Sequence, residues 1–383
     1  MDLSFNEAEQ AFALEVRRWL AANLENPGEF EDLDAEIEWG RSWQARLAET
    51  RWVGIGWPRE YGGRGAGPVE VAIYNAEYAR AGAPQPVNRV GLNLAGPTLL
   101  AHGTDEQRAR WLPAILSASE LWCQLFSEPR AGSDLAALGT RAVRVGDGWL
   151  LTGQKVWNSY AQFSRWGLCL ARTDPDAPRH AGLTLFAVDM TAPGVQVRPL
   201  VQITGDPEFN EVVLTDVFVP DEAVIGGVGR GWSVAATTLA HERGTAFPFK
   251  EEVVHEIYLT RLLREGLVTG ALDDPAVAAR LAACAVRIQV LRSHNWRTLS
   301  RLARGFEPGP ESSVTKLAWT DLTQELSEAA LDVIGADALV AGRWTRQWLW
   351  SKAASIAGGT SEIQRSIIGD RILGLPRVEH ERR

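Results

Sequence analysis

The spacing of hydrophobic residues along this chain changes twice. The resulting order of helical and strand-like segments limits the folds that the chain can adopt. Up to residue 118 apolar residues recur at helical spacing, as with Phe12, Val16 and Trp19. From 119 to 228 β-type residues alternate in short segments that Pro and Gly separate, and helical spacing then returns to the end. The order predicts an α+β protein with a helical N-terminal domain (1–118), a middle antiparallel β domain (119–228) and a C-terminal helical domain (229–383).

Local signals place some of the elements. Gly146-Asp147-Gly148, between two alternating segments, predicts a β-hairpin. Ser4 with Glu7, and Thr104 with Gln107, have the spacing of a capping box and predict helix starts. The glycine-rich stretch from 54 to 67 predicts a loop.

Charge and residue usage exclude several classes of protein. The net charge of −9 argues against a nucleic-acid surface, which needs a basic stripe. We expect no membrane span, because no run approaches the roughly 20 apolar residues that one requires. The three separate cysteines favour a reducing cytoplasm, and the histidines lack metal-ligand spacing, so no metal is expected. Rossmann, Walker and GxSxG motifs are missing from the sequence.

Two segments carry residues suited to a ligand site. WCQLFSEPRAGSDLAAL (122–138) places the hydroxyls of Ser127 and Ser133 on a tight loop near Gly132, which suits a heteroaromatic edge or an anion. The alternative is an ordinary turn that closes a sheet. Further on, GQKVWNS places Trp157 on a strand, where a tryptophan is more often part of the core.

Taken together, these strings resemble those of a known family. SEPRAGSDLA, GDGWLLTGQKVW and AGGTSEIQRSIIGDRILGLPR, with GWPREYGG and LPAILSASELWCQ, are similar in order and spacing to motifs of the acyl-CoA dehydrogenase superfamily, across nearly the whole chain. The resemblance implies a C-terminal four-helix bundle, a homodimer or homotetramer, and FAD as cofactor. It also implies an acyl-CoA or acyl-carrier thioester as substrate and an electron-transfer flavoprotein as electron acceptor.

The resemblance also assigns residues to the site. It implies that the flavin ring contacts the edge of one strand and a second strand that carries a tryptophan. It also implies that a turn lies near the cofactor phosphate and the substrate thioester, and that the start of a helix late in the chain contacts FAD. The corresponding cofactor-binding residues are Gln124, Leu125, Phe126 and Ser127; Trp157, Asn158 and Ser159; Gly132 and Ser133; and Thr360, Ser361 and Glu362. Ser133, Arg243 and Gly358 are the implied substrate-binding residues.

The catalytic base departs from the commonest family pattern. Many relatives carry a glutamate directly before the Gly-Thr of the last motif, but the matching position here is Gly358. Some branches, similar to isovaleryl-CoA dehydrogenase, place the base before an arginine on the first C-terminal helix, which corresponds to Glu242 and Arg243. We therefore expect Glu242 to be the base, with its pKa raised by burial. The alternative is an exposed pair of charges.

The sequence departs from the family pattern at a second place, and two alternative functions stay open. Asp332 stands where relatives often have glutamine, and the Arg-x-Gln-Phe-Gly string is missing, so a contact to the FAD pyrophosphate is expected to be remade or lost. A flavin oxidase or monooxygenase could use the same scaffold. A non-catalytic partner subunit of a hetero-oligomeric dehydrogenase is the third possibility.

Overall fold

The computed structural model describes residues 5–26, 28, 30–242, 247–306 and 309–376, with only the backbone of Glu242 and of 247–249. Two compact units divide the chain. One comprises Met1–Leu24, Gly67–Ala83 and Arg243–Arg383, and the other comprises Glu25–Ala66 and Pro84–Glu242. The first is called the helical unit and the second the sheet unit. The three predicted domains, with boundaries after 118 and 228, stay a prediction.

Helices make up the helical unit and flank the strands of the sheet unit. The helical unit holds α1 (Glu7–Asn23), α3 (Pro68–Arg80), α7 (Phe247–Thr269), α8 (Pro275–Leu302), α9 (Glu311–Ile334), α10 (Arg343–Ser351) and α11 (Ser361–Ile367). The sheet unit holds α2 (Leu33–Glu49), the π-turn η2 (Gly91–Ala95), α4 (Gly96–His102), α5 (Asp105–Ser117) and α6 (Gly231–Glu242).

The strands form one eight-stranded sheet in the order β6-β7-β3-β2-β4-β5-β8, with β1 also paired to β4. Their bounds are β1 (Trp122–Leu125), β2 (Arg141–Val145), β3 (Gly148–Ser159), β4 (Trp166–Arg172), β5 (Leu183–Asp189), β6 (Val195–Leu200), β7 (Phe209–Pro220) and β8 (Val224–Ile225). The antiparallel prediction holds for most pairs, but β1 and β2 run parallel to β4, so the sheet is mixed. That pairing joins strands far apart in sequence, which alternation alone does not predict.

Several local predictions are confirmed. β2 and β3 form the expected hairpin, in which Val145 pairs with Gly148 and Gly146 adopts a φ of 56°. Thr104 and Gln107 form the capping box of α5. The capping box of α1 is made by Asn6 and Glu9 rather than by the predicted pair, and Ser4 lies outside the described residues.

A buried polar hub ties the helices of the sheet unit to the start of β1. Gln44 on α2 donates to the carbonyls of Ile115 and Leu116 at 2.9 and 3.0 Å. Its own oxygen accepts the N–H of Asn88, whose side-chain oxygen in turn accepts the N–H of Trp122 at 3.0 Å. Because all these groups are buried, each bond would be costly to lose, and β1 therefore begins at a fixed place.

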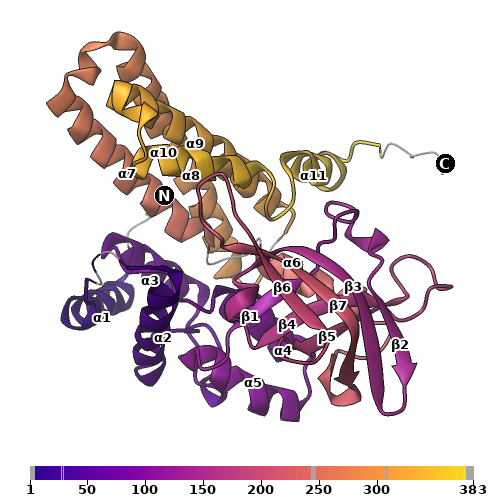
Figure 1. Ribbon diagram of the computed structural model, residues 1–383. Coiled ribbons are helices and arrows are strands. Elements are labelled where there is room, and N and C mark those ends of the chain that lie inside the picture. Colours follow the sequence, from indigo (N-terminus) through magenta and orange to yellow (C-terminus); the bar gives the residue numbers. More distant parts are fainter. Residues whose placement is uncertain (1–4, 27, 29, 243–246, 307–308, 377–383) are drawn as a thin grey trace. The chain divides into compact units, whose positions relative to one another are not determined.

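The core of the helical unit lies among its long helices. Figure 1 shows α7, α8, α9 and α10 side by side, and buried residues from all four form one cluster. α1 and α3 belong to the same unit, where Glu77 on α3 is buried and pairs with Arg17 at 2.5 Å and with Arg80 at 2.7 Å. The predicted C-terminal helical region is therefore confirmed as helical, and it packs with two N-terminal helices.

One buried carboxylate in this unit makes stability depend on pH. Glu252 on α7 is 7% exposed, and burial raises the pKa of its carboxyl to about 6 although Asn295 donates to it at 2.6 Å. The folded chain therefore holds this proton more tightly than the unfolded chain. As a result, the free energy of unfolding falls as pH rises from about 4.5 through about 6.

Replacing Glu252 with glutamine should remove that dependence. Because one pKa unit corresponds to about 1.4 kcal/mol, we expect Glu252→Gln to raise the free energy of unfolding above pH 6 by about 2 kcal/mol, with little change near pH 4. Urea unfolding across this pH range measures the effect. Glu7→Gln, at an exposed glutamate of α1 in the same unit, is the control and should leave the pH dependence unchanged. A variant that stays less stable than the parent at pH 7 would contradict the prediction.

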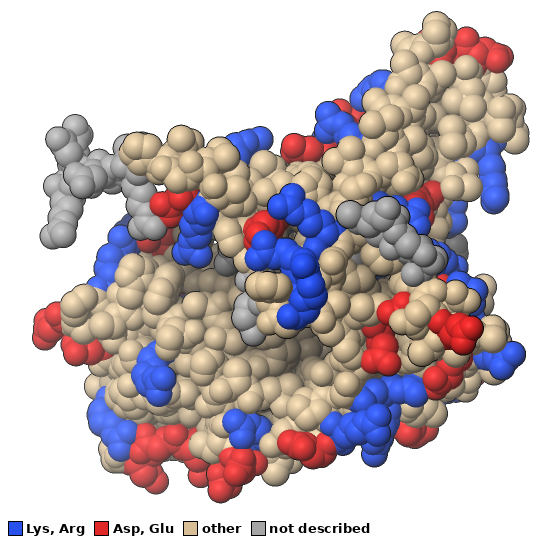
Figure 2. Space-filling view, turned by 180° about the vertical axis from the view of Figure 1, so that it is seen from behind, with Lys and Arg blue, Asp and Glu red and all other residues tan. Residues whose placement is uncertain are grey.

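Two observations concern the predictions that the chain has no nucleic-acid surface and no membrane span. On the face shown in Figure 2, basic side chains are interspersed with acidic ones. Among the described residues, none of the helices is both long and apolar enough to cross a membrane.

Candidate active site

The strand edge that carries the first predicted segment is interrupted. β1 lies parallel to the first part of β4, with Leu125 opposite Cys169, and β2 joins the same edge only where Arg141 faces Arg172. The loop from 126 to 140 spans the interval between them. The carbonyl of Leu170 on β4 lies within this interval and must find a partner other than a neighbouring strand.

The tryptophan of the second segment lies on a β-bulge. The β3–β7 register shifts between Lys155, which faces Val212, and Asn158, which faces Asn210, so two residues of β3 oppose one of β7. Trp157 in this bulge has a φ of 61°, a strained value for a bulky residue. The bulge lets both Lys155 and Asn158 point inward while Trp157 points outward.

Trp157 is therefore not a core residue. Its side chain is 63% exposed, and its nearest ring partner is Phe209, edge-on at 6.0 Å between centroids. A large apolar ring exposed by a strained backbone indicates a surface on which another flat ring can stack. The predicted contact of Trp157 with an isoalloxazine stays a prediction.

Asn158 has a different place from its neighbour. It is 1% exposed, its amide donates to the carbonyl of Gln124 on β1 at 2.6 Å, and its backbone carbonyl accepts from Asn210 at 3.0 Å. The side chain thus links β3 to β1 beneath the bulge. Its direct contact with a cofactor stays a prediction.

Two hydroxyls near the bulge have no partner among the described residues. Ser127 and Ser159 are partly buried, and no hydrogen bond from either side chain is found there. The carbonyl of Ser127 accepts the N–H of Val156 at 3.0 Å, which holds the first serine beside the tryptophan strand. Because Leu125 and Phe126 are buried, those two residues could reach a cofactor only through their backbone.

The loop after Ser127 is held by a buried ion pair. Glu128 accepts the N–H groups of Gly139 and Thr140 at 2.6 and 2.9 Å, and Lys155 donates to it at 2.9 Å. Burial alone would raise the pKa of the Glu128 carboxyl, but the charge of Lys155 and these hydrogen bonds lower it below its ordinary value. Gly132 is exposed and has open space around it, and Ser133 is exposed next to it.

Lys155 is not among the residues predicted from the sequence. The signal was a lysine inside an alternating strand, one of only four lysines in the chain. A charge at such a position is either on the solvent face or paired within the core.

α6 carries the predicted base at its last residue. Thr238 on α6 bonds Thr98 on α4 at 2.8 Å between hydroxyls, and Thr237 bonds the Nε2 of His102 at 2.8 Å. These bonds fix the helix within the sheet unit. The side chain of Glu242 and all of Arg243 lie outside the described residues, so their roles stay predictions.

The remaining predicted residues lie in the helical unit. Thr360 is the N-cap of α11 and accepts the N–H of Ile363 at 3.3 Å, while Ser361 and Glu362 form the first turn. Gly358 and Gly359 both have positive φ, and Gln364 donates to the carbonyls of both. The predicted helix start is confirmed, and its contact with FAD stays a prediction.

Asp332 also lies in the helical unit, near the end of α9. It forms an ion pair with Arg280 on α8. Its charge is therefore compensated within the chain.

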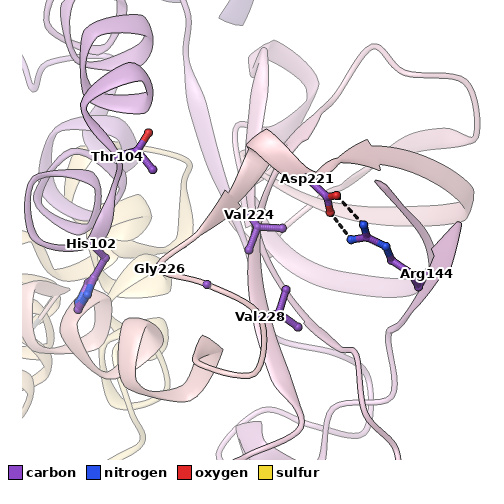
Figure 3. Close-up of a pocket in the computed structure, with 8 residues that line it drawn as sticks. His102, Thr104, Arg144, Asp221, Val224, Gly226 and Val228 are labelled. Carbon is purple, nitrogen blue, oxygen red and sulfur yellow. Dashed lines mark hydrogen bonds and ion pairs between the residues drawn. The ribbon is translucent and has the colours of Figure 1, made fainter. Parts of the chain in front are cut away.

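A cavity of about 520 Å³ in the sheet unit lies apart from these residues. Figure 3 shows its lining, which consists of His102, Thr104, Arg144, Asp221, Val224, Gly226, Gly227 and Val228. Arg144 pairs with Asp221, His102 bonds Thr237, and Thr104 caps α5, so its polar side chains already have partners. No predicted site residue lines it, and we do not assign the cofactor to it.

The exposed indole of Trp157 and the neighbouring hydroxyls of Ser127 and Ser159 could receive a flat ligand with a polar edge, and comparison with known proteins defines the family. Models of the N-terminal, middle and C-terminal domains of acyl-CoA dehydrogenase match residues 6–119, 123–217 and 229–373. The chain therefore belongs to the acyl-CoA dehydrogenase family, whose members are oxidoreductases. FAD binding is implied by that membership, and Trp157, Ser127 and Ser159 offer a stacking surface and hydrogen-bonding groups that fit such a cofactor.

Individual relatives cover nearly the whole chain. It is 42% identical over 382 residues to acyl-CoA dehydrogenase IpdE1 of Mycobacterium tuberculosis, covering 96% of this chain and 98% of the relative. Among solved structures, the Tcur3481-Tcur3483 steroid ACAD matches with a TM-score of 0.87 at 28% identity, covering 99% and 100% of the two chains. The ChsE4-ChsE5 complex from Mycobacterium tuberculosis matches with a TM-score of 0.84 at 30% identity, with the same coverage.

Proposed function

We propose that the chain removes hydrogen across the α,β bond of an acyl-CoA thioester, with FAD as cofactor and Glu242 as base. The observation that carries the proposal is Trp157, an indole held outward by a strained bulge beside the hydroxyls of Ser127 and Ser159. A flat cofactor with a polar edge uses both features, and a structural role for Trp157 in the core explains neither.

The chemistry assigns a separate task to each group. When bound, FAD supplies the acceptor for the hydride that leaves the β-carbon. Glu242 takes the α-proton, which is too weakly acidic to leave without a positioned base. Gly358 has no side chain to act as base, but its backbone N–H can donate to the thioester carbonyl and stabilise the charge that develops there. Ser127 and Ser159 donate to the polar edge of the cofactor.

Anaerobic flavin bleaching tests the proposed reaction. The holoenzyme is mixed with a panel of acyl-CoA and acyl-carrier thioesters, and loss of the oxidised flavin absorbance reports hydride transfer. Because a similar structure is a steroid ACAD, thioesters with a steroid side chain belong in the panel beside straight and branched chains. Reduction by none of them would contradict dehydrogenation. Rapid reoxidation of the reduced flavin by air would favour the oxidase alternative, and slow reoxidation would favour an electron-transfer flavoprotein as acceptor.

Loss of the indole should weaken cofactor binding without weakening the fold. We expect Trp157→Ala to raise the Kd for FAD by about 10- to 100-fold, because ring stacking contributes about 1–3 kcal/mol. The free energy of unfolding of the apo chain should stay within about 0.5 kcal/mol of the parent, since the side chain is mostly exposed.

Fluorescence titration of the apo chain with FAD measures this affinity. Phe218→Ala removes another exposed ring on β7, at the far end of the β3–β7 pairing, and should leave the affinity unchanged. Equal effects of the two substitutions would argue against stacking on Trp157.

A hetero-oligomeric subunit is the second candidate. The ChsE4-ChsE5 complex and the Tcur3481-Tcur3483 steroid ACAD are both named for two different chains. Gly358 provides no carboxylate at the position where many relatives carry the base. The same absence is expected of a chain that relies on a partner subunit for catalysis. Light scattering and flavin content of the chain expressed alone distinguish the cases. A stable flavin-loaded homodimer or homotetramer that reduces its flavin with substrate supports the first proposal, and an inactive flavin-free chain supports the second.

A further inference from the structure

The interval in the edge of β4 contains a charged group rather than an apolar side chain. Lys155 is 0% exposed, and its ammonium donates to the carbonyls of Leu170 at 2.8 Å and Phe126 at 3.1 Å and to the Glu128 carboxylate at 2.9 Å. An ammonium has three N–H donors, so all of them are used. The side chain thus bonds β4, the end of β1 and the following loop at one point.

A contribution to the stability of the fold does not by itself explain why Lys155 and Glu128 are buried as an ion pair. Removing two charges from water costs free energy that their attraction only partly offsets, and apolar residues of similar volume often serve as well or better. An apolar side chain, however, could not bond two carbonyls and a carboxylate in fixed directions. The lysine is therefore better explained by the geometry that it imposes on the backbone.

That geometry acts on Ser127. The described peptide bonds are trans, so the C=O of Phe126 and the N–H of Ser127 point in opposite directions. Because Lys155 holds the carbonyl of Phe126 inward, the N–H of Ser127 points away from the core. No acceptor for this N–H is found among the described residues, and the Ser127 carbonyl is held by the N–H of Val156, next to Trp157.

We propose that Lys155 is a positioning residue for the cofactor site: by holding the Phe126 carbonyl inward, it turns the N–H of Ser127 toward the flavin edge. The inference rests on the proposed function, because it requires FAD to lie against this strand. Lys155 itself is buried and touches no cofactor. Glu128 secures the loop from the other side through the N–H groups of Gly139 and Thr140.

Three variants separate positioning from stability. Lys155→Met keeps the length of the side chain but removes every donor, and it leaves Glu128 with two backbone donors. We expect its Kd for FAD to rise at least about tenfold, the loss expected for one or two ligand hydrogen bonds. Glu128→Gln keeps one oxygen to accept from the ammonium and leaves both carbonyl bonds of Lys155 in place. It removes the acceptor of Gly139 or Thr140 and should lower stability, but its Kd for FAD should stay within about threefold of the parent. Lys352→Met breaks a comparable but half-exposed pair with Glu328 and should leave FAD binding unchanged.

The readouts are FAD titration, the visible spectrum of the bound flavin and amide hydrogen exchange of the peptide containing Ser127. A folded Lys155→Met chain with parental affinity, spectrum and exchange would overturn the inference, and so would an equal loss of affinity in Glu128→Gln. If Lys155→Met does not fold, exchange in the parent decides. Slower exchange of the Ser127 amide on adding FAD supports the proposal, and unchanged exchange refutes it.

The same data separate this inference from the proposed function. A parent chain that binds no FAD would refute both. A parent that binds FAD and is bleached by an acyl-CoA, beside a Lys155→Met variant that binds FAD equally well, would refute only the role of Lys155.

Discussion

Glu242→Gln should retain yellow FAD and bind acyl-CoA, yet lose reduction of the flavin by substrate. Glutamine has the shape of glutamate but cannot accept a proton at neutral pH, so only the removal of the α-proton is lost. Removing a general base typically slows the chemical step by about 10² to 10⁴. Gly358, at the position where many relatives carry their base, offers no carboxylate to replace it.

Anaerobic stopped-flow absorbance measures this step directly. The holoenzyme and variant are mixed with the thioester that bleaches the parent fastest, and the first-order rate of bleaching is compared. Glu106→Gln on α5 replaces an exposed glutamate of the same unit and should bleach at the parental rate. If Glu242→Gln also bleaches at that rate, the base must lie elsewhere in the chain.

Gly231→Ala should displace or destabilise α6 without changing any predicted site residue. A Cβ at this first residue of α6 would lie 2.6 Å from both the Cα and the N of Thr184 and 2.7 Å from the carbonyl carbon of Leu183. These are backbone atoms of β5, which cannot rotate aside as a side chain can. We expect the free energy of unfolding to fall by about 3 kcal/mol, the upper end for overpacking, and flavin reduction to slow because Glu242 ends the same helix.

Urea unfolding and stopped-flow bleaching of the same preparation test both parts of this prediction. Gly369→Ala is the matched control, since the nearest atom to its Cβ is 3.7 Å away, at an ordinary contact distance. A Gly231→Ala chain as stable and as fast as the parent would show that the close approach of α6 to β5 does not position the base.

The elements that were predicted correctly from the sequence are formed by residues that lie close together in the chain. The β2–β3 hairpin was predictable because a glycine turn and strand alternation lie within about twenty residues. Thr104 caps α5 through a residue three positions away, so its role could be seen in the sequence. Capping failed as a guide at α1, where two similar polar–acidic pairs compete and Asn6 with Glu9 forms the box.

The amino-acid sequence by itself determined the order of helices and strands and the family, since those signals reside in local patterns and motif spacing. Only the tertiary structure decided that β1 runs parallel to β4, that Trp157 faces outward on a bulge, and that Lys155 fills the interval between strand ends. A buried ammonium needs partners on all sides, and its acceptors Phe126, Glu128 and Leu170 come together only when separate strands pair.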